Sequence, residues 1–223
     1  GIVLAVVYLI FNEGYLASSG EPIRTDLSEE AIRLGRLLRQ LIPDETEVMG
    51  LLALMLLTDA RRAARVAGGE LVVLHEQDRT QWNRALISEG HALVSAAMAP
   101  GVIGPYVLMA AINALHTATT DPRDTPWERI ASLYDRLFAI SPTPIVALNR
   151  AVAIAEVDGP QVALTQIESL ELDGYHAWHA TRADFLRRLG RTDEAREAYA
   201  AAIEATGNEA ERNYLTRRRS QLG

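Results

Sequence analysis

Apolar residues occur along this 223-residue chain in two kinds of stretch. In residues 2–11 and 48–57 almost every position is apolar, which is typical of a helix that other helices surround. In residues 31–41 leucines recur every three or four positions with arginines between them, as in a helix with one face in the core. Neither apolar stretch reaches the roughly 20 residues of a membrane span. The pattern predicts an all-α fold that does not cross a membrane.

Residues 44–66 are predicted to form the central helix of the N-terminal half. Asp44 precedes Glu47 by three residues, which is the capping-box pattern of a helix start. The apolar part of this segment ends at Asp59. The arginines that follow are expected to leave the core and carry their charge into solvent: Arg61, Arg62 and Arg65.

A Gly-Gly pair at 68–69 stands next to the β-branched run of residues 71–74 and predicts a small β-hairpin. A long helix is expected to begin at Asp78 or Thr80 and to continue past Trp82. The loop at 121–125 is the best candidate for an internal boundary. We therefore predict two parts: an N-terminal helical bundle over residues 1–120 and a second helical part over residues 121–223.

The second part is predicted to consist of tetratricopeptide-like helix-turn-helix repeats. Helix starts are expected at Thr125, in a second capping box, and at Thr143, each directly before a proline. Small residues at facing positions allow paired helices to approach closely, and a period in the low thirties is typical of such repeats. Two units are clear, and a degenerate third covers 127–142. A shift of 32 residues aligns these pairs: Ala151 with Ala183, Ala163 with Ala195, Ile167 with Tyr199, and Leu170 with Ala202.

The charge and cysteine content narrow the possible functions. The net charge is -7 and the pI is about 5.3, whereas a free-standing nucleic-acid binder usually has a basic face. The only basic run is Arg217–Arg219, which is expected at a helix end. No cysteine is present, so neither a disulfide nor a thiolate metal site can form. We expect no direct nucleic-acid binding by this chain and a cytoplasmic location.

Few residues in the sequence are candidates for metal binding or catalysis. His176 and His179 have the i, i+3 spacing that could share a metal ion on one helix face, but ordinary groove histidines are far commoner. The chain has no nucleophile elbow, glycine-rich phosphate loop or zinc-protease motif. We therefore predict no metal, no cofactor and no enzymatic activity. A small-molecule sensor or an enzyme remains an alternative, which predicts a closed polar pocket near Glu13 or His91.

Three segments together resemble a known family: YLIFNEGY at 8–15, DLSEEAIRLGRLL at 26–38, and the segment 51–82 with its DARRAARV and HEQDRTQW motifs. Their order and spacing are similar to the long C-terminal extension of a subgroup of extracytoplasmic-function (ECF) sigma factors of bacterial RNA polymerase. In that subgroup the sigma-2 and sigma-4 modules come first, and a helical, tetratricopeptide-like extension follows. The resemblance is specific over the first 95 residues and looser in the repeats. Residues with counterparts in the sigma-2 and sigma-4 modules are not found in this sequence.

The resemblance implies a regulatory role in transcription initiation, through contacts with the sigma modules of the same protein, with RNA polymerase or with a signalling protein. A general tetratricopeptide-like scaffold that binds peptides is the alternative. A helix-turn-helix module encoded before Ile2 would favour the first, and a start codon there the second. The candidate contact residues come from the matched motifs and from the repeats: Asn12, Glu13, Asp59, Arg61, Arg62, Asp78, Arg79, Trp82, His176, His179 and Arg182.

Overall fold

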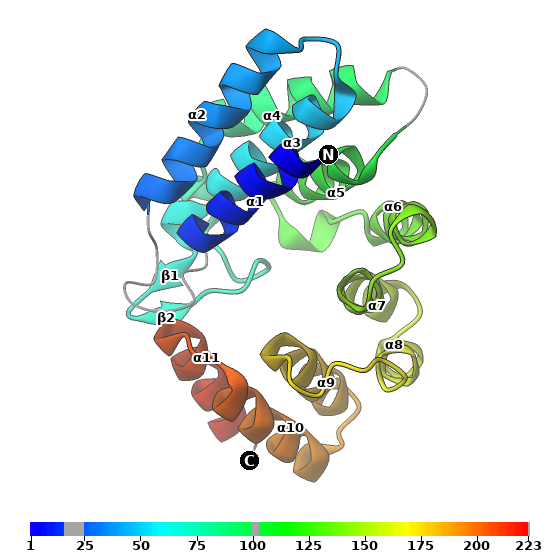
Figure 1. Cartoon of the computed structure of the whole chain (residues 1–223). Coiled ribbons are helices and arrows are strands. Elements are labelled where there is room, and N and C mark those ends of the chain that lie inside the picture. The colour runs from blue at the N-terminus through cyan, green and yellow to red at the C-terminus, as the bar shows by residue number, and fades with distance from the viewer. Residues whose placement is uncertain (16–24, 100–102, 223) are drawn as a thin grey trace. The chain divides into compact units, whose positions relative to one another are not determined.

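The computed structural model describes residues 1–15, 25–99 and 103–222 (Figure 1). In this part of the chain it contains eleven α-helices, three short 3-10 helices and one two-stranded sheet, which confirms the predicted all-α fold. The chain divides into two compact units. The first comprises residues 1–66 and 72–125, and the second comprises residues 67–71 and 126–223. The sequence placed the boundary at 120/121, five residues before the observed change of unit at 125/126.

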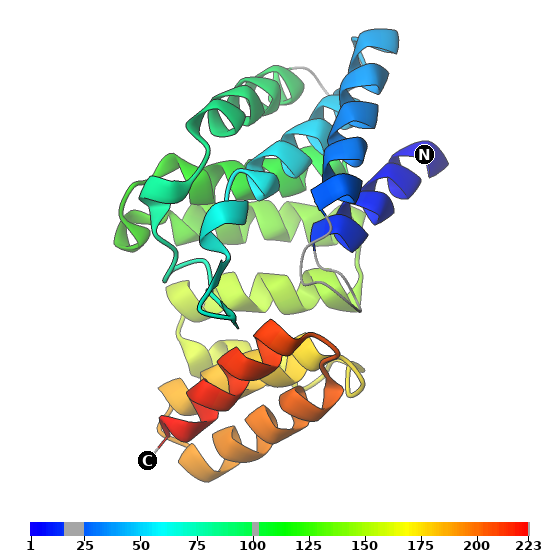
Figure 2. The same cartoon turned by 90° about the vertical axis from the view of Figure 1, so that its left-hand side faces the viewer.

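The first unit consists of five α-helices and three 3-10 helices. In Figures 1 and 2, α3 lies between the pair α1–α2 and the pair α4–α5, and it packs against all four. Every residue from Val48 to Leu57 is buried, as predicted for this continuously apolar segment. The elements are α1 (Ile2–Tyr15), α2 (Thr25–Leu41), α3 (Thr46–Asp59), η1 (Arg62–Ala64), η2 (Arg79–Gln81), α4 (Arg84–Met98), α5 (Pro105–Ala118) and η3 (Pro122–Asp124).

The second unit contains six α-helices and most of a β-hairpin. Figure 1 shows α6 to α10 following one another in chain order, and each helix packs against the next. Its elements are β1 (Val66–Ala67), β2 (Glu70–Leu71), α6 (Trp127–Ile140), α7 (Pro144–Val157), α8 (Pro160–Ile167), α9 (His176–Arg188), α10 (Thr192–Ala205) and α11 (Glu209–Ser220).

The predicted repeat is visible in the helix starts. Helices α7 and α9 begin at 144 and 176, and α8 and α10 begin at 160 and 192, so both pairs are 32 residues apart. The aligned alanines are all fully buried, as expected for close helix pairing. The alignment fails at its last pair, because Leu170 lies after the end of α8 whereas Ala202 lies inside α10. The aligned alanines are Ala151, Ala183, Ala163 and Ala195.

The predicted hairpin is also confirmed. Gly68 and Gly69 have φ values of 59° and 78°, which a two-residue turn of this type requires and which glycine adopts without strain. The hairpin packs against α11. The Arg217 Nε lies 2.6 Å from a Glu70 carboxylate oxygen, and the Asn213 amide donates a 3.2 Å hydrogen bond to the Gly69 carbonyl. Asn213 and Arg217 of α11 therefore hold the hairpin in the second unit.

The predicted capping box at the start of α3 is wrong. Helix α3 begins at Thr46, and its N-cap residue, Glu45, makes no capping hydrogen bond with its side chain. Glu47 instead accepts hydrogen bonds of 3.1 Å from the backbone N–H groups of Tyr106 and Val107, the second and third residues of α5. The carboxylate therefore neutralises the positive end of a neighbouring helix. The sequence analysis therefore took Glu47 for part of a local capping motif, whereas it contacts a helix that is far away in sequence.

Two other predicted helix starts need correction. Asp78 caps only the turn of η2, where it accepts a 2.9 Å hydrogen bond from the Thr80 N–H. The long helix begins later, at Arg84, with the Asn83 side chain accepting from two backbone N–H groups at 3.1 and 3.2 Å. Thr125 does not cap α6, because its hydroxyl donates to the Pro122 carbonyl at 2.6 Å.

The predicted start of α7 at Thr143 is confirmed. The Thr143 hydroxyl accepts a 3.2 Å hydrogen bond from the Val146 N–H, and Pro144 occupies the first helical position. None of the helices in the described ranges is both long and apolar enough to cross a bilayer.

Candidate functional site

The two polar segments singled out in the sequence, 59–65 and 78–84, lie side by side in the first unit. The Asn83 N–H donates a 2.8 Å hydrogen bond to the Ala60 carbonyl and joins them. Both segments reach the C-terminal half of α5. Arg61 donates to the Asn113 side chain there at 3.0 Å, and Arg79 donates to the last carbonyl groups of the helix. We call Arg61, Arg79, Trp82 and His116 the arginine cluster.

Of the two arginines in the cluster, Arg79 has the smaller exposed surface, which is 6% of the residue. Its Nη1 donates to the His116 carbonyl at 3.2 Å, and to the carbonyl and hydroxyl oxygens of Thr119, both at 2.7 Å. These carbonyl groups form the negative end of α5, which a cation stabilises. The guanidinium carbon lies 4.8 Å from the ring centroid of Trp82, which is 2% exposed. The prediction that Asp78, Arg79 and Trp82 form a polar contact surface therefore meets a physical objection, because Arg79 and Trp82 are inside the fold.

Arg61 does not leave the core, contrary to the sequence prediction. Its Nη2 donates to the Asn113 oxygen at 3.0 Å, whereas its Nε is buried without a hydrogen-bond partner. Burial lowers the pKa of the Arg61 guanidinium, and the nearby charge of Arg65 lowers this pKa further. The residue as a whole keeps more exposure than Arg79 does.

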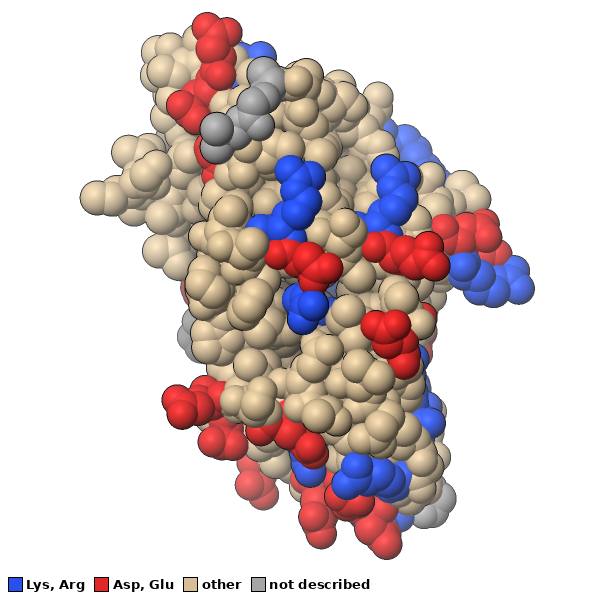
Figure 3. Space-filling model, turned by 90° about the vertical axis from the view of Figure 1, so that its right-hand side faces the viewer, with Lys and Arg blue, Asp and Glu red and all other residues tan. Residues whose placement is uncertain are grey.

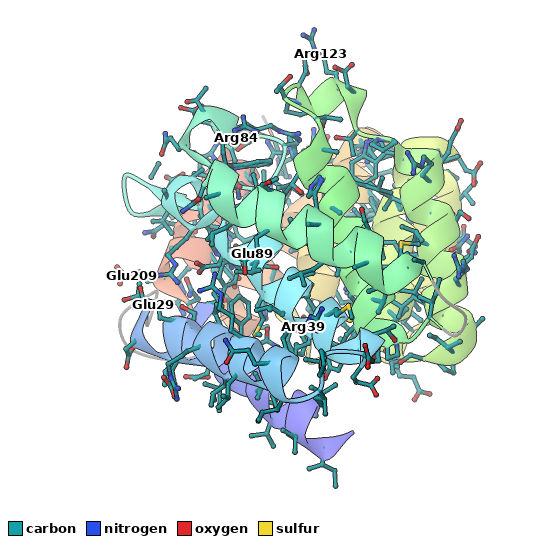
Figure 4. The ribbon with its side chains drawn as sticks, turned by 90° about the horizontal axis from the view of Figure 1, so that it is seen from above. Glu29, Arg39, Arg84, Glu89, Arg123 and Glu209 are labelled. Carbon is teal, nitrogen blue, oxygen red and sulfur yellow. The ribbon has the colours of Figure 1, made fainter. Side chains whose placement is uncertain are left out.

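Carboxylates balance the charge of this region only in part. The charge of Asp121 opposes the burial that lowers the pKa of Arg79, but the ion pair of Asp121 is formed with Arg123. Among the described residues of the first unit, ion pairs within 4.0 Å involve other arginines, such as Arg36 with Glu89 and Arg62 with Asp59. Figure 4 labels Arg84 and Glu89, which both belong to α4; Glu89 pairs with α2 rather than with Arg84. No ion pair with a described carboxylate is formed by four arginines around the cluster: Arg61, Arg65, Arg79 and Arg84.

Aromatic rings and carbonyl groups replace the absent carboxylates in part. The Arg65 guanidinium carbon lies 4.1 Å from the ring centroid of Tyr15, in cation–π geometry. Arg84 donates a long, 3.4 Å hydrogen bond to the Arg79 carbonyl. Neither contact removes a positive charge. The region is therefore locally positive in a chain whose net charge is -7.

His116 carries no charge at neutral pH. Burial, together with the charges of Arg61 and Arg79, lowers the pKa of its imidazole from 6.5 to about 3. The dependence of this pKa on both arginines shows that their charges act on the same side chain from two segments. His116 was not selected as a candidate site residue from the sequence. Polar residues at 113, 116 and 117, on a helix that is otherwise apolar, were the signal that could have found it.

Three buried N–H donors of the cluster have no acceptor: Arg61 Nε, Arg79 Nε and Trp82 Nε1. In the described part of the chain only six buried side-chain polar atoms lack a hydrogen-bond partner, and half of them are therefore in this cluster. Buried donors are almost always paired in native proteins, because an unpaired donor costs about 1–3 kcal/mol. Their concentration in one place therefore calls for an explanation.

Arg62 and Asp59 have a structural role next to the cluster. Arg62 forms hydrogen bonds with Asp59 and with the Ser28 hydroxyl, the latter at 2.8 Å, and lies 3.5 Å from a Glu29 oxygen. These contacts connect α2 to the end of α3. Burial raises the pKa of Asp59, although the hydrogen bond from Arg62 opposes this effect. In α1, Asn12 forms a hydrogen bond with Tyr8, whose pKa burial raises, and Glu13 is exposed.

The candidate residues of the second unit lie close together in sequence but make separate contacts. The His179 Nε2 lies 2.7 Å from the Asp173 carbonyl, whereas the His176 Nδ1 lies 3.3 Å from a Glu211 oxygen in α11. Arg182 lies 3.8 Å from Glu168. Within the described ranges no group of three histidine or acidic residues is arranged to hold a metal ion. His176 therefore helps to join α9 to α11.

Residues 1–98 match a family described as a family of unknown function (DUF6596). The chain is also 46% identical over 217 residues to an uncharacterized protein of Rhizobium meliloti (strain 1021). That alignment covers 96% of this chain and 51% of the relative, so the chain spans about half the length of the curated relative that it matches. The family match includes Arg61, Arg79 and Trp82 but ends before α5.

Proposed function

We propose that this chain is the regulatory, protein-interacting C-terminal part of an ECF-type sigma factor and acts in transcription initiation in the cytoplasm. The segments 8–15, 26–38 and 51–82 support the proposal through their resemblance to that extension. The relative from Rhizobium meliloti is about twice as long as this chain, which leaves room for further modules in a protein of that kind.

The observation that carries the proposal is an exposed apolar face on α1. Ile2 is 85% exposed, Val3 60%, Val6 49% and Leu9 66%. At 100° per residue these four side chains lie on one side of the helix, opposite the buried Leu4, Val7 and Phe11. A contiguous apolar face of this kind is typical of a surface that another protein module covers. In the proposed arrangement the sigma modules of the same protein cover it, since in the family resembled here they directly precede YLIFNEGY.

The distribution of charge supports contacts with protein rather than with DNA. On the face drawn in Figure 3, arginine and carboxylate side chains lie next to one another instead of forming a uniformly basic patch. Arg150 and Asp135, which join α7 to α6, are 2.6 Å apart. Arginines that are paired in this way do not attract a phosphate backbone. The proposed partners are therefore the sigma modules, RNA polymerase or a signalling protein.

Binding of core RNA polymerase by the full-length protein tests this function. The full-length protein is expected to form a stoichiometric complex with core polymerase and to start transcripts at specific promoters in a purified system. Size-exclusion chromatography and a transcript assay measure the two properties. A full-length protein that binds no core polymerase and starts no transcript would contradict the proposal. In that case a tetratricopeptide-like peptide-binding scaffold, suggested by the two helix pairs 32 residues apart, becomes the better hypothesis.

A further inference from the structure

We propose that the arginine cluster of the first unit binds a small oxyanion, such as the phosphate or carboxylate group of a small molecule. The three unpaired N–H donors and the excess of positive charge are two independent observations that point to the same kind of ligand. This inference does not depend on the sigma-factor assignment, because it concerns only residues that are in contact within the first unit.

The cluster offers three unpaired N–H donors to a ligand with several acceptor oxygens. The Arg79 Nη1 already donates to three oxygens at the end of α5, but the Arg79 Nε has no acceptor. The indole of Trp82, over which the Arg79 guanidinium lies at 4.8 Å, also lacks an acceptor for its Nε1–H. Arg61 contributes a third unpaired donor from the other segment. Guanidinium and indole groups only donate, so the ligand must supply acceptors.

The charge of the cluster specifies the ligand further. Each buried arginine without a carboxylate partner retains a desolvation cost that an opposite charge would offset. Water could pair with the donors, but a water molecule carries no net charge and leaves the excess positive charge of the cluster unchanged. An oxyanion supplies acceptors and charge together, and guanidinium groups bind carboxylate and phosphate through paired N–H donors. His116 is uncharged at pH 7, because its pKa is about 3, and therefore adds no positive charge to the cluster.

Of the two arginines in the cluster, Arg61 keeps more of its residue surface exposed, so we place the access to the donors beside it. The net charge of -7 repels anions at long range, so binding depends on the local donors. A small anion fits this requirement better than an acidic peptide does, because the Arg79 and Trp82 donors are buried. The site is therefore selective for a compact anionic group.

A titration of the full-length protein with inorganic phosphate, and separately with succinate, tests the proposal. The ionic strength is kept constant with chloride, and the indole N–H resonances are followed by NMR with the Trp82 signal assigned from Trp82→Phe. The Trp82 resonance is expected to shift saturably with at least one of the two anions. The indole of Trp178 already donates to the Ile167 carbonyl at 2.9 Å, so its resonance should stay in place. The anion that binds more tightly identifies the group, phosphate or carboxylate.

Matched variants locate the binding. Arg61→Gln is expected to weaken the affinity by about tenfold or more, the usual effect of losing a charge-assisted hydrogen bond. Arg36→Gln removes the same charge from the same unit at an exposed pair and should change the affinity by less than about twofold. Arg61→Lys keeps the charge while removing the Nε donor, and should also weaken binding if Arg61→Gln does not fold. A Trp82 resonance that moves no more than in chloride, or a foldable Arg61 variant with unchanged affinity, would overturn the proposal.

Discussion

Replacing Gly50 by alanine is expected to lower the free energy of unfolding of the first unit by about 3 kcal/mol, a large loss for overpacking. A Cβ atom at this position would lie 2.5 Å from the Val107 nitrogen and 2.8 Å from the Tyr106 carbonyl carbon. Both are backbone atoms of α5, so the clash separates α3 from α5. Alanine gains roughly 1 kcal/mol in helix propensity, which is not enough to offset the clash. Urea unfolding followed by circular dichroism measures the difference.

Gly35→Ala is the matched control for this substitution. A Cβ atom at position 35, also in a helix of the first unit, would come within 2.7 Å of the Met55 terminal methyl group. Because that atom ends a flexible side chain, it can move aside, and the substitution should cost much less than Gly50→Ala. Equal losses at the two positions would contradict the account of a close backbone approach between α3 and α5.

Acidification from pH 7 to pH 5 is expected to destabilise the first unit by up to about 2 kcal/mol through His116 alone. The folded state holds the pKa of His116 at about 3, below its ordinary value of 6.5. Between these two values the unfolded chain binds more protons than the folded chain does. Stability therefore falls as the pH drops below about 6.5, and a proton on the folded state would add a third positive charge beside Arg61 and Arg79. Burial lowers the pKa of His91 as well, which adds a smaller effect of the same sign.

His116→Gln should flatten the dependence of the unfolding free energy on pH between 5 and 7, where few carboxylates titrate. His75→Gln serves as its control, because it makes the same substitution at an exposed loop position. Denaturant unfolding at several pH values provides the comparison. A His116→Gln variant that keeps the slope of the unsubstituted protein would show that the acid sensitivity has another source.

The sequence predicts those features of the fold that depend on local patterns. The continuous apolar run of residues 48–57 indicates the buried α3, and the Gly-Gly pair at 68–69 indicates the hairpin. The Thr-Pro pair at 143–144 indicates the start of α7. The predicted role of Glu47 was wrong because its partner is α5, about 60 residues away along the chain. Capping rules apply only to contacts within one helix, so they cannot predict such a pairing.

The sequence identified two of the segments that form the candidate site, but neither their burial nor the contribution of α5. The motifs at 59–65 and 78–84 were selected from the sequence, and the structure brings them together. Their position inside the fold was not foreseen, because a charged residue after an apolar helix ordinarily points to solvent. Arg79 stays inside because the carbonyl end of α5 accepts its hydrogen bonds, and α5 supplies residues that no local motif marks. Asn113, His116 and Thr119 could therefore be recognised only in the folded structure.

Burial also changes which surface is the best candidate for a protein partner. Trp82 and Arg79 have too little exposed surface for such a contact, and Arg62 is held by Asp59 and Ser28. The apolar face of α1 is more suitable, since its side chains have no partner element among the described residues that buries them. The proposed function therefore requires that another module of the protein covers this face.

The reactivity of a cysteine placed at Leu9 in the full-length protein measures this directly. The 223 residues contain no cysteine, so alkylation at an introduced one is readily located by peptide mass spectrometry. Leu9→Cys is compared with Ile140→Cys, whose parent side chain is 52% exposed in the second unit against 66% for Leu9. We expect Leu9→Cys to be alkylated at least about tenfold more slowly than Ile140→Cys, because the sigma modules cover α1 in the proposed arrangement. Alkylation at equal rates would contradict it.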